Sequence, residues 1–375
     1  MRKVLIFYAK YGGGHLSVAK SIREELETNY HDDVSVEMVD CIEYINKAVN
    51  KLTVTAYKEM AKKFPWAWGK VYSHSQKGVM SRISKDSNKI MALKLYFLIK
   101  KINPDIIISA HPFSTQMCTY LRKRNKLNAK IVNILTDFAP HEQWLVGSQF
   151  VDYFFVAHDG MKNELIKHGI DSNKIYATGI PVSDRFFKKY NKADVCKEFG
   201  LSEDKDTVLF FAGGEFGLGR KSTYEILETL ARDFDDLQIV AISGKNKKMK
   251  HNFDNIIEKY QKYDIIKVIS FTNKVPELMS ISKIVITKPG GITSSESLAS
   301  GVPLLIINPI PGQEEENASF LENSGFGIWM KKTDLPSDIL AKVFNNPNII
   351  NNMKNNIINY KKGNSTEEIC KIVIG

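Results

Sequence analysis

Side chains that could do acid–base chemistry follow the ends of apolar segments in the first half of the chain. His15 comes directly after three glycines, and these glycines follow the apolar run Val4–Ala9. This order predicts a strand, a tight turn and the start of a helix, and the helix N-terminus would keep an imidazole neutral. A neutral imidazole can accept a proton, so His15 is a candidate general base. A structural role for a lone histidine is the alternative.

Two further polar groups follow predicted strands in the same way. His111 follows the predicted strand Ile106–Ser109, and Asp137 follows the predicted strand Ile131–Leu135. The carboxyl ends of parallel strands meet at one edge of a sheet, so we expect both residues near His15. Asp137 would orient His15 or act as the base itself. A base at this edge would take a proton from a bound substrate group, which we call the acceptor. The residues that we assign to the acceptor site are Gly14, His111, Pro112, His141 and Trp144.

The three histidines of this region, His15, His111 and His141, raise the question of a metal site. Zinc ligands in proteins usually show short, regular spacings, which these histidines lack. We therefore predict no metal site.

The segment GGEFGLGR at residues 213–220 follows the predicted strand Thr207–Ala212 and precedes the predicted helix Ser222–Phe234. A glycine-rich turn at such a position lets backbone N–H groups approach a phosphate closely, and an arginine could add a charged hydrogen bond. A plain left-handed turn is the alternative. The residues that we assign to phosphate binding are Gly213, Gly214, Glu215, Gly217 and Arg220.

Two later segments complete a candidate nucleotide-sugar site. In TKPGGITSSE, a strand should end at Thr287 and a helix should begin near Thr293, which would place Glu296 in the first turn. Glu296 could bind the vicinal hydroxyls of a ribose, or it could form a capping box with Thr293. In PGQEEENA, which follows the predicted strand Leu304–Asn308, polar side chains could orient sugar hydroxyls or merely cap a helix. The assigned residues are Lys288, Gly290, Gly291, Thr293, Glu296, Gln313, Glu314 and Asn317.

Strands and helices alternate through the chain, and the pattern restarts near Val208. This alternation predicts an α/β protein with two Rossmann-like, doubly wound domains that face a central cleft. We expect an acceptor-binding domain at residues 1–180, a donor-binding domain at 181–355 and a helical tail at 356–375 that packs back on the first domain. Pro181 lies in the expected linker.

Composition restricts the class of protein. The 375 residues are 43% hydrophobic and 25% charged, which suits two globular cores. The four cysteines form no CxxC pair, the first residues lack the pattern of a signal peptide, and no apolar run of about 18 residues occurs. We therefore expect a reduced, cytoplasmic, soluble chain.

The net charge of +10 is concentrated in one region. Residues 41–100 contain twelve Lys and Arg against three Asp and Glu, an excess of nine positive charges. Within it, residues 46–91 interrupt the strand–helix rhythm and mix lysines with aromatic residues, which favours contact with an anionic membrane surface. A solvated surface is the alternative, and no nucleic-acid-binding module is recognisable. The candidate membrane residues are Lys62, Lys63, Phe64, Trp66, Trp68 and Lys70.

Taken together, the segments resemble the family of the monogalactosyldiacylglycerol synthases and processive diacylglycerol glucosyltransferases, which is related to the lipid-linked glycosyltransferase of peptidoglycan synthesis. The resemblance covers nearly the whole chain. It is carried in order by YGGGHLSVAKSI, AHPF, TDFAPHEQW, GIPV, GGEFGLG, TKPGGITSSESLASGVP and PGQEEENA.

The resemblance implies a GT-B fold and an inverting, metal-independent transfer of a hexose from UDP-glucose or UDP-galactose to diacylglycerol. It implies peripheral attachment to the inner face of the cell membrane and no cofactor besides the UDP-sugar co-substrate. It also implies that Phe271 and Val275 hold the uracil, that Gly214 meets the diphosphate, and that His15 lies on the acceptor side.

Three other functions remain open at this point. The same fold occurs in UDP-sugar epimerases, in transferases that act on polyprenyl-linked precursors, and in principle in a UDP-sugar-sensing membrane protein without activity. The basic, aromatic insertion argues against an epimerase, whereas HPF and PGQEEENA favour the diacylglycerol enzymes.

Overall fold

The computed structural model describes residues 1–10, 13–45, 92–212, 221–244, 246–360 and 363–375. It divides into two compact units, which are described separately. Unit 1 contains Met1–Ser183, Pro311–Gln313 and Lys362–Gly375, and unit 2 contains Asp184–Ile310 and Glu314–Lys361. The boundary that we expected from the sequence lies three residues before the one found, between residues 180 and 181.

Unit 1 is built on a six-stranded sheet in which every described pairing is parallel. The strand order is β2-β1-β3-β4-β5-β6, so the chain turns from one side of β1 to the other between β2 and β3. This topological switch point is where open α/β sheets usually bind ligands. The strands are β1 (Arg2–Tyr8), β2 (Val34–Asp40), β3 (Ile106–Ser109), β4 (Lys130–Ile134), β5 (Tyr153–Phe155) and β6 (Ile175–Tyr176).

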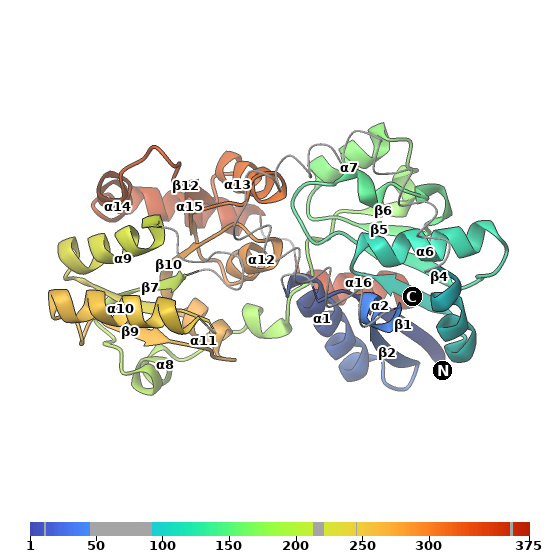
Figure 1. Ribbon diagram of the computed structural model, residues 1–375, viewed down its shortest axis with the longest axis horizontal. Helices are drawn as coiled ribbons and strands as arrows, with labels where there is room; N and C mark the ends of the chain where they lie inside the picture. The colour runs from blue at the N-terminus through green and yellow to red at the C-terminus, as the bar shows by residue number, and fades with distance from the viewer. Residues whose placement is uncertain (11–12, 46–91, 213–220, 245, 361–362) are drawn as a thin grey trace. The chain divides into compact units, whose positions relative to one another are not determined.

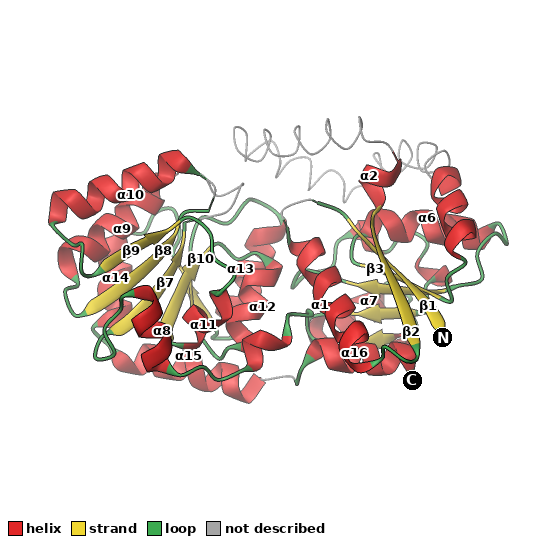
Figure 2. Ribbon diagram, turned by 90° about the horizontal axis from the view of Figure 1, so that it is seen from below, coloured by secondary structure: helices red, strands yellow, loops and turns green. Residues whose placement is uncertain are grey.

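Helices cover both faces of this sheet (Figure 2). The helical segments of unit 1 are α1 (Gly14–Asn29), α2 (Cys41–Ile45), residues 92–102, α6 (Pro112–Lys123), α7 (Asp159–Lys167) and α16 (Ser365–Ile374), with the short 3-10 turns η1 (Glu142–Trp144), η2 (Ser148–Phe150) and η3 (Ser172–Lys174).

Helix α16 comes from the far end of the chain and packs against α1 (Figure 1). Its first two hydroxyls fix it in place, because Ser365 Oγ donates to the Ile180 carbonyl at 2.9 Å and Thr366 Oγ1 donates to the Val182 carbonyl at 2.7 Å. Val373 and Ile374 are buried in the same helix. Unit 1 is therefore completed by residues that follow unit 2 in the sequence.

Unit 2 repeats the architecture with a second six-stranded parallel sheet in the order β12-β11-β10-β7-β8-β9. Its switch point lies between β7 and β10. The strands are β7 (Asp206–Phe211), β8 (Leu237–Ile242), β9 (Ile266–Ile269), β10 (Ser282–Thr287), β11 (Leu304–Ile306) and β12 (Gly327–Trp329). The helical segments are η4 (Asp184–Phe187), α8 (Lys192–Phe199), α9 (Lys221–Asp233), α10 (Lys247–Tyr260), α11 (Val275–Ser280), α12 (Gly291–Ala299), α13 (Gln313–Asn323), α14 (Pro336–Phe344) and α15 (Pro347–Tyr360).

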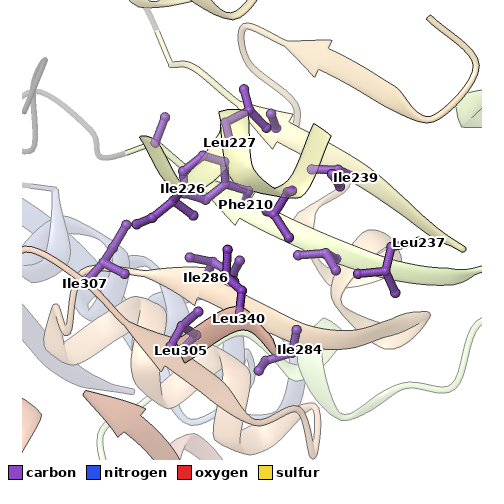
Figure 3. Close-up of a cluster of buried hydrophobic side chains, with 14 of the residues drawn as sticks. Phe210, Ile226, Leu227, Leu237, Ile239, Ile284, Ile286, Leu305, Ile307 and Leu340 are labelled. Carbon is purple, nitrogen blue, oxygen red and sulfur yellow. The ribbon is translucent and has the colours of Figure 1, made fainter. Parts of the chain in front are cut away.

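Alternate residues of the unit 2 strands form one side of a hydrophobic core. Phe210 of β7 and Ile286 of β10 have no exposed surface and face Leu227 of α9 and Leu340 of α14 (Figure 3). Burial of one such side chain stabilises the fold by about 1.5–3 kcal/mol. The period of two in the strands and of 3.6 in the helices is what the sequence displays in these segments.

The predicted fold class, α/β with two Rossmann-like doubly wound sheets, is confirmed. Two details of the expectation are wrong. Strand β11 ends at Ile306 rather than at Asn308, whose backbone is left-handed, and the short strands β6 and β12 were not expected. Among the described helices, none is both long and apolar enough to span a membrane.

Candidate functional site

The switch point of unit 1 places His15 at the beginning of α1. Gly13 precedes the helix with φ of 83°, a left-handed conformation that glycine adopts without the steric cost of a Cβ atom. Helix α1 begins one residue later, at Gly14, so His15 lies in its first turn. Strand β3, which ends just before His111, pairs directly with β1.

The imidazole of His15 is oriented by the chain that follows β3. Its Nδ1 atom lies 2.6 Å from the carbonyl oxygen of Ala110 and 3.2 Å from the hydroxyl of Thr136. A carbonyl oxygen can only accept a hydrogen bond, so Nδ1 carries the proton. The lone pair of the neutral ring is therefore on Nε2, which is the atom that could act as a base.

Burial lowers the pKa of His15 to about 4, and the hydrogen bond to Ala110 opposes this change. We expected the helix N-terminus to lower this pKa, but loss of solvent is the main cause. His15 is consequently neutral at neutral pH.

His111 lies against His15, with ring centroids 4.7 Å apart and an angle of 80° between the ring planes. Its Nδ1 accepts a hydrogen bond from the backbone N–H of Phe113 at 3.2 Å, so it caps α6, and Pro112 is the first residue of that helix. Burial, with smaller repulsions from His15 and His141, holds the pKa of His111 well below its usual value.

His141 and Trp144 belong to the loop after β4. The two rings are 6.2 Å apart, Trp144 is 2% exposed, and burial lowers the pKa of His141 to about 4. Asp137 lies in the same loop, three residues after the end of β4 at Ile134. Within the described ranges, no group of three or more His, Cys, Asp or Glu side chains is arranged to hold a metal ion.

Sequence reasoning missed the groups that fix this region. The Ala110 carbonyl and the Thr136 hydroxyl orient His15, and neither carries a signal in the sequence. His158 was also missed, although it follows a strand as His15 does. Its Nε2 donates to the Phe138 carbonyl at 2.8 Å and its Nδ1 accepts from the Met161 N–H at 3.3 Å, so it fixes the loop after β4.

In unit 2, residues 213–220 lie outside the described residues, and with them the predicted phosphate ligands Gly213, Gly214, Glu215, Gly217 and Arg220. The same is true of the predicted membrane residues Lys62, Lys63, Phe64, Trp66, Trp68 and Lys70. The described residues do include the first turn of α9 and the ends of β10 and β11.

An ion pair links the end of β10 to α13, the helix that follows β11. Lys288 follows β10, and its ammonium lies 2.6 Å from Oε1 of Glu314 in the first turn of α13. The other carboxylate oxygen of Glu314 accepts the N–H of Ile310 at 2.8 Å. Asn317, which is fully buried, donates to the carbonyl of Pro289 at 3.0 Å. Three residues assigned to donor binding from the sequence thus also hold one another's loops in place.

Helix α12 begins earlier than expected. It starts at Gly291, and its N-cap residue is Gly290, which offers no side-chain hydrogen bond. Thr293 is therefore the third helical residue, so the capping-box interpretation of Thr293 and Glu296 is wrong. The expectation that Glu296 lies in the first turn is wrong as well, because it is the sixth helical residue.

Glu296 is half-buried, and desolvation raises the pKa of its carboxyl to about 8. The hydroxyl of Ser294, fully buried in the same helix, makes no hydrogen bond in the described structure. The helix start and these two side chains leave donors and acceptors available to a polar ligand. The remaining predicted donor residues lie on other elements: Gln313 is the first residue of α13, Val275 is the first residue of α11, and Phe271, in the loop after β9, is 75% exposed.

Two family models match the chain. Residues 15–182 match the monogalactosyldiacylglycerol (MGDG) synthase family. Residues 145–374, more than half of the chain, match the UDP-N-acetylglucosamine 2-epimerase family, so this part of the chain belongs to that family as well.

Among solved structures, MurG from Acinetobacter baumannii aligns with a TM-score of 0.66 at 13% identity over 100% of this chain and 99% of MurG. The UDP-GlcNAc 2-epimerase of Neisseria meningitidis aligns with a TM-score of 0.62 at 14% identity over 99% of each chain. At such low identity these likenesses concern the fold, which is the GT-B fold.

Curated relatives extend over the full length. The processive diacylglycerol beta-glucosyltransferase of Bacillus licheniformis is 30% identical over 100% of this chain and 94% of its own. The protein of the same name from Bacillus subtilis is 30% identical over 100% of this chain and 95% of its own. A two-sheet fold, a histidine at the first switch point and a polar cluster at the second accompany this full-length similarity. The chain belongs to the family of the processive diacylglycerol beta-glucosyltransferases.

Proposed function

We propose that the protein transfers a hexose from UDP-glucose or UDP-galactose to the hydroxyl of diacylglycerol, with inversion at the anomeric carbon. The observation that carries the proposal is the orientation of His15, whose Nδ1–H donates to Ala110 and whose Nε2 lone pair is left as a base. The full-length relatives, which are named as diacylglycerol beta-glucosyltransferases, supply the acceptor class.

The reaction is a single displacement. The acceptor oxygen forms a bond to the anomeric carbon while the bond from that carbon to the diphosphate oxygen breaks, and UDP leaves with the bonding electrons. The hydroxyl proton passes to Nε2 of His15. Because hexoses are α-linked in UDP-glucose and UDP-galactose, one displacement gives a β-linked product, in keeping with the names of the relatives.

A base with a pKa of about 4 is weak towards a free alcohol. The proton of the acceptor becomes strongly acidic only as its oxygen bonds to carbon, so its transfer to His15 should accompany or follow that step. The low pKa has the advantage that nearly every molecule starts with an unprotonated Nε2 at neutral pH. Asp137 remains the alternative base, since it directly follows Thr136, whose hydroxyl lies 3.2 Å from His15.

The donor would bind to unit 2, where the first turns of α9, α12 and α13 follow neighbouring strands. Glu296 would accept the ribose hydroxyls, and Gln313 and Glu314 would meet the hexose. Backbone N–H groups at the start of α9 and in the glycine-rich segment before it would stabilise the departing diphosphate. We propose that these groups suffice and that the transfer requires no metal.

The acceptor is a membrane lipid, so the protein should work as a peripheral protein on the inner face of the cell membrane. The sequence supports this through the positive, aromatic segment 46–91. We propose an anionic membrane surface as its partner and no nucleic acid.

A UDP-sugar epimerase is the second candidate, because residues 145–374 match an epimerase family model. That match covers the unit assigned to the donor, which an epimerase and a transferase would share, and it leaves residues 1–144 unmatched. The full-length relatives are transferases, which favours transfer.

One experiment separates the candidates. The protein is incubated with diacylglycerol liposomes and with UDP-glucose, UDP-galactose or UDP-N-acetylglucosamine, and both lipid and nucleotide products are identified by mass spectrometry and chromatography. A hexosyl-diacylglycerol with release of UDP is expected. Formation of an epimeric UDP-sugar without lipid product would assign an epimerase, a polyprenyl acceptor used in place of diacylglycerol would assign the related transferases, and binding without any product would indicate a sensor.

A further inference from the structure

Asn308 has an unusual backbone for its place in the fold. Four non-glycine residues in the described ranges have positive φ, and three of them, Asn103, Asn125 and Gln261, end helices. Left-handed residues are common at helix ends. Asn308, with φ of 49°, instead follows strand β11 and precedes a proline. Strained backbone of this kind persists only where surrounding contacts hold it, and it is frequent at functional sites.

The side chain of Asn308 makes two hydrogen bonds to the first turn of α9. Its Oδ1 accepts from the hydroxyl of Ser222 at 2.7 Å, and its Nδ2 donates to Oγ1 of Thr223 at 3.2 Å. Both amide atoms are thereby used, and the side chain is held by two hydroxyls of the same helical turn. Strand β10 lies between β11 and β7 in the sheet, and α9 follows β7 in the sequence. These bonds therefore connect the loop after β11 to a helix that follows a strand two positions away in the sheet.

The same loop is tied to the start of α13. Ile310, two residues after Asn308, donates its N–H to Glu314, which is also paired with Lys288. The short segment 308–310 therefore connects the first turn of α9 to the carboxylate of Glu314. In the proposed function the first turn of α9 faces the diphosphate and Glu314 faces the hexose, so the segment lies between two parts of one ligand's binding site.

We propose that Asn308 is a positioning residue of the donor site, which holds the first turn of α9 and the Glu314 loop in the arrangement that binds a sugar diphosphate. The inference rests on the proposed function. It assigns Asn308 no contact with substrate. Loss of the side chain should affect some ligands more than others. It should weaken the binding of ligands that contain the diphosphate, whereas the binding of uridine, which would contact α11 and α12, should change little.

The test compares Asn308→Gly with wild type. Glycine accepts the left-handed backbone, so this change removes the two hydrogen bonds without adding strain. A matched control is Asn125→Gly, which makes the same chemical change at another left-handed asparagine, exposed at the end of α6 in unit 1. Dissociation constants for uridine, UDP and UDP-glucose are measured by calorimetry, well below the melting temperature of each variant.

We expect Asn308→Gly to raise the dissociation constant of UDP on the order of tenfold and that of UDP-glucose by at least as much, as the loss of two neutral hydrogen bonds suggests. The dissociation constant of uridine should rise by less than about twofold. Ser222→Ala should also weaken UDP binding, and it should have little further effect when combined with Asn308→Gly, because the bond between Ser222 and Asn308 is already lost in that variant. Asn125→Gly should match wild type for all three ligands.

Two results would overturn the inference while leaving the donor site intact. One is wild-type affinity of Asn308→Gly for UDP and UDP-glucose. The other is an equal loss for uridine and UDP, which would assign Asn308 to the general stability of unit 2. Failure of the wild-type protein to bind UDP at all would instead remove the proposed function, and the inference with it.

Discussion

The ammonium of Lys288 and the carboxylate of Glu314 are 2.6 Å apart, and their side chains are only 20% and 15% exposed. Lys288 directly follows strand β10, whereas Glu314 lies in the first turn of helix α13. An ion pair with so little solvent around it depends on both partners, because either one alone would leave a poorly hydrated charge.

Lys288→Met should therefore lower the free energy of unfolding by about 1–3 kcal/mol and raise the KM for the UDP-hexose. The double variant Lys288→Met with Glu314→Leu should regain much of the stability, since no unpaired charge remains, but it should not regain the KM. Urea unfolding and steady-state kinetics measure the two effects. Recovery of both in the double variant would show that the pair is only structural.

His15→Ala should lower turnover by about two to four orders of magnitude, the range for loss of a general base. The affinity for UDP should stay close to wild type, because the donor is assigned to unit 2. Thr136→Val is the matched control, since it removes the weaker contact to Nδ1 and leaves the Ala110 carbonyl in place. Near-normal turnover of His15→Ala on saturating lipid would transfer the role of base to Asp137.

The low pKa of His15 predicts two pH effects. Turnover should not titrate through His15 between about pH 5 and 8, because the folded protein takes up this proton only near pH 4. The unfolded chain takes it up near 6.5, so stability is lost as the pH falls from about 6.5 to 4. Urea titrations of wild type and His15→Ala should diverge in this window, with wild type the more acid-sensitive, and parallel curves would contradict the low pKa.

Glu296 predicts the opposite dependence. Its carboxyl has a pKa of about 8 in the folded protein, above the value of about 4.5 in the unfolded chain. The contribution of the protonated group to stability is complete below about pH 4.5 and is lost as the pH rises through 8. Without ligand, wild type should thus lose more stability than Glu296→Gln between pH 5 and 8. Equal losses in urea titrations would mean that Glu296 ionises normally.

Removal of the Glu296 side chain should also weaken binding of the donor nucleotide. We expect Glu296→Ala to reduce UDP affinity by about 1–3 kcal/mol, because the ribose hydroxyls would lose their acceptor. Calorimetry with UDP tests this. The helix cap is no longer available as an explanation, since α12 is capped at Gly290, so an unchanged affinity would place the ribose elsewhere.

Membrane binding should depend on charge and on aromatic residues separately. Charge reversal at Lys62, Lys63 and Lys70 should reduce co-sedimentation with anionic liposomes at low salt, because each basic residue near such a surface contributes roughly 1 kcal/mol. Trp66→Ala should reduce it most clearly at high salt, where charges are screened and the apolar contribution remains. Equal binding of all variants to neutral and anionic liposomes would exclude residues 46–91 from the attachment.

The sequence predicted those parts of the fold that repeat a pattern over several residues. Strand β1 and helix α1 show clear apolar periods, so their order and the place of His15 could be anticipated. Strands β6 and β12, of two and three residues, are too short to show a period. Asn308 was expected to end a strand, and only its backbone angle and its bonds to α9 reveal the difference.

Two further kinds of feature could not be predicted from the sequence: hydrogen bonds made by the backbone, and the residue at which a helix begins. The carbonyl of Ala110 sets the protonated atom of His15, yet a carbonyl belongs to every residue and leaves no trace in the sequence. Helix α12 starts at two glycines, which usually interrupt helices, so its true start and the position of Glu296 were missed.

Helix α16 has a consequence for the order in which the protein can mature on the ribosome. The strands of unit 1 are complete by residue 176, but the surface of α1 that α16 covers stays open until residue 374 has been made. At typical rates of translation, the interval of nearly 200 residues lasts roughly 10–40 s. During that time the nascent first unit exposes an apolar strip to solvent, so we expect it to bind chaperones. A ribosome that stalls within unit 2 would release a chain in which neither unit can be completed.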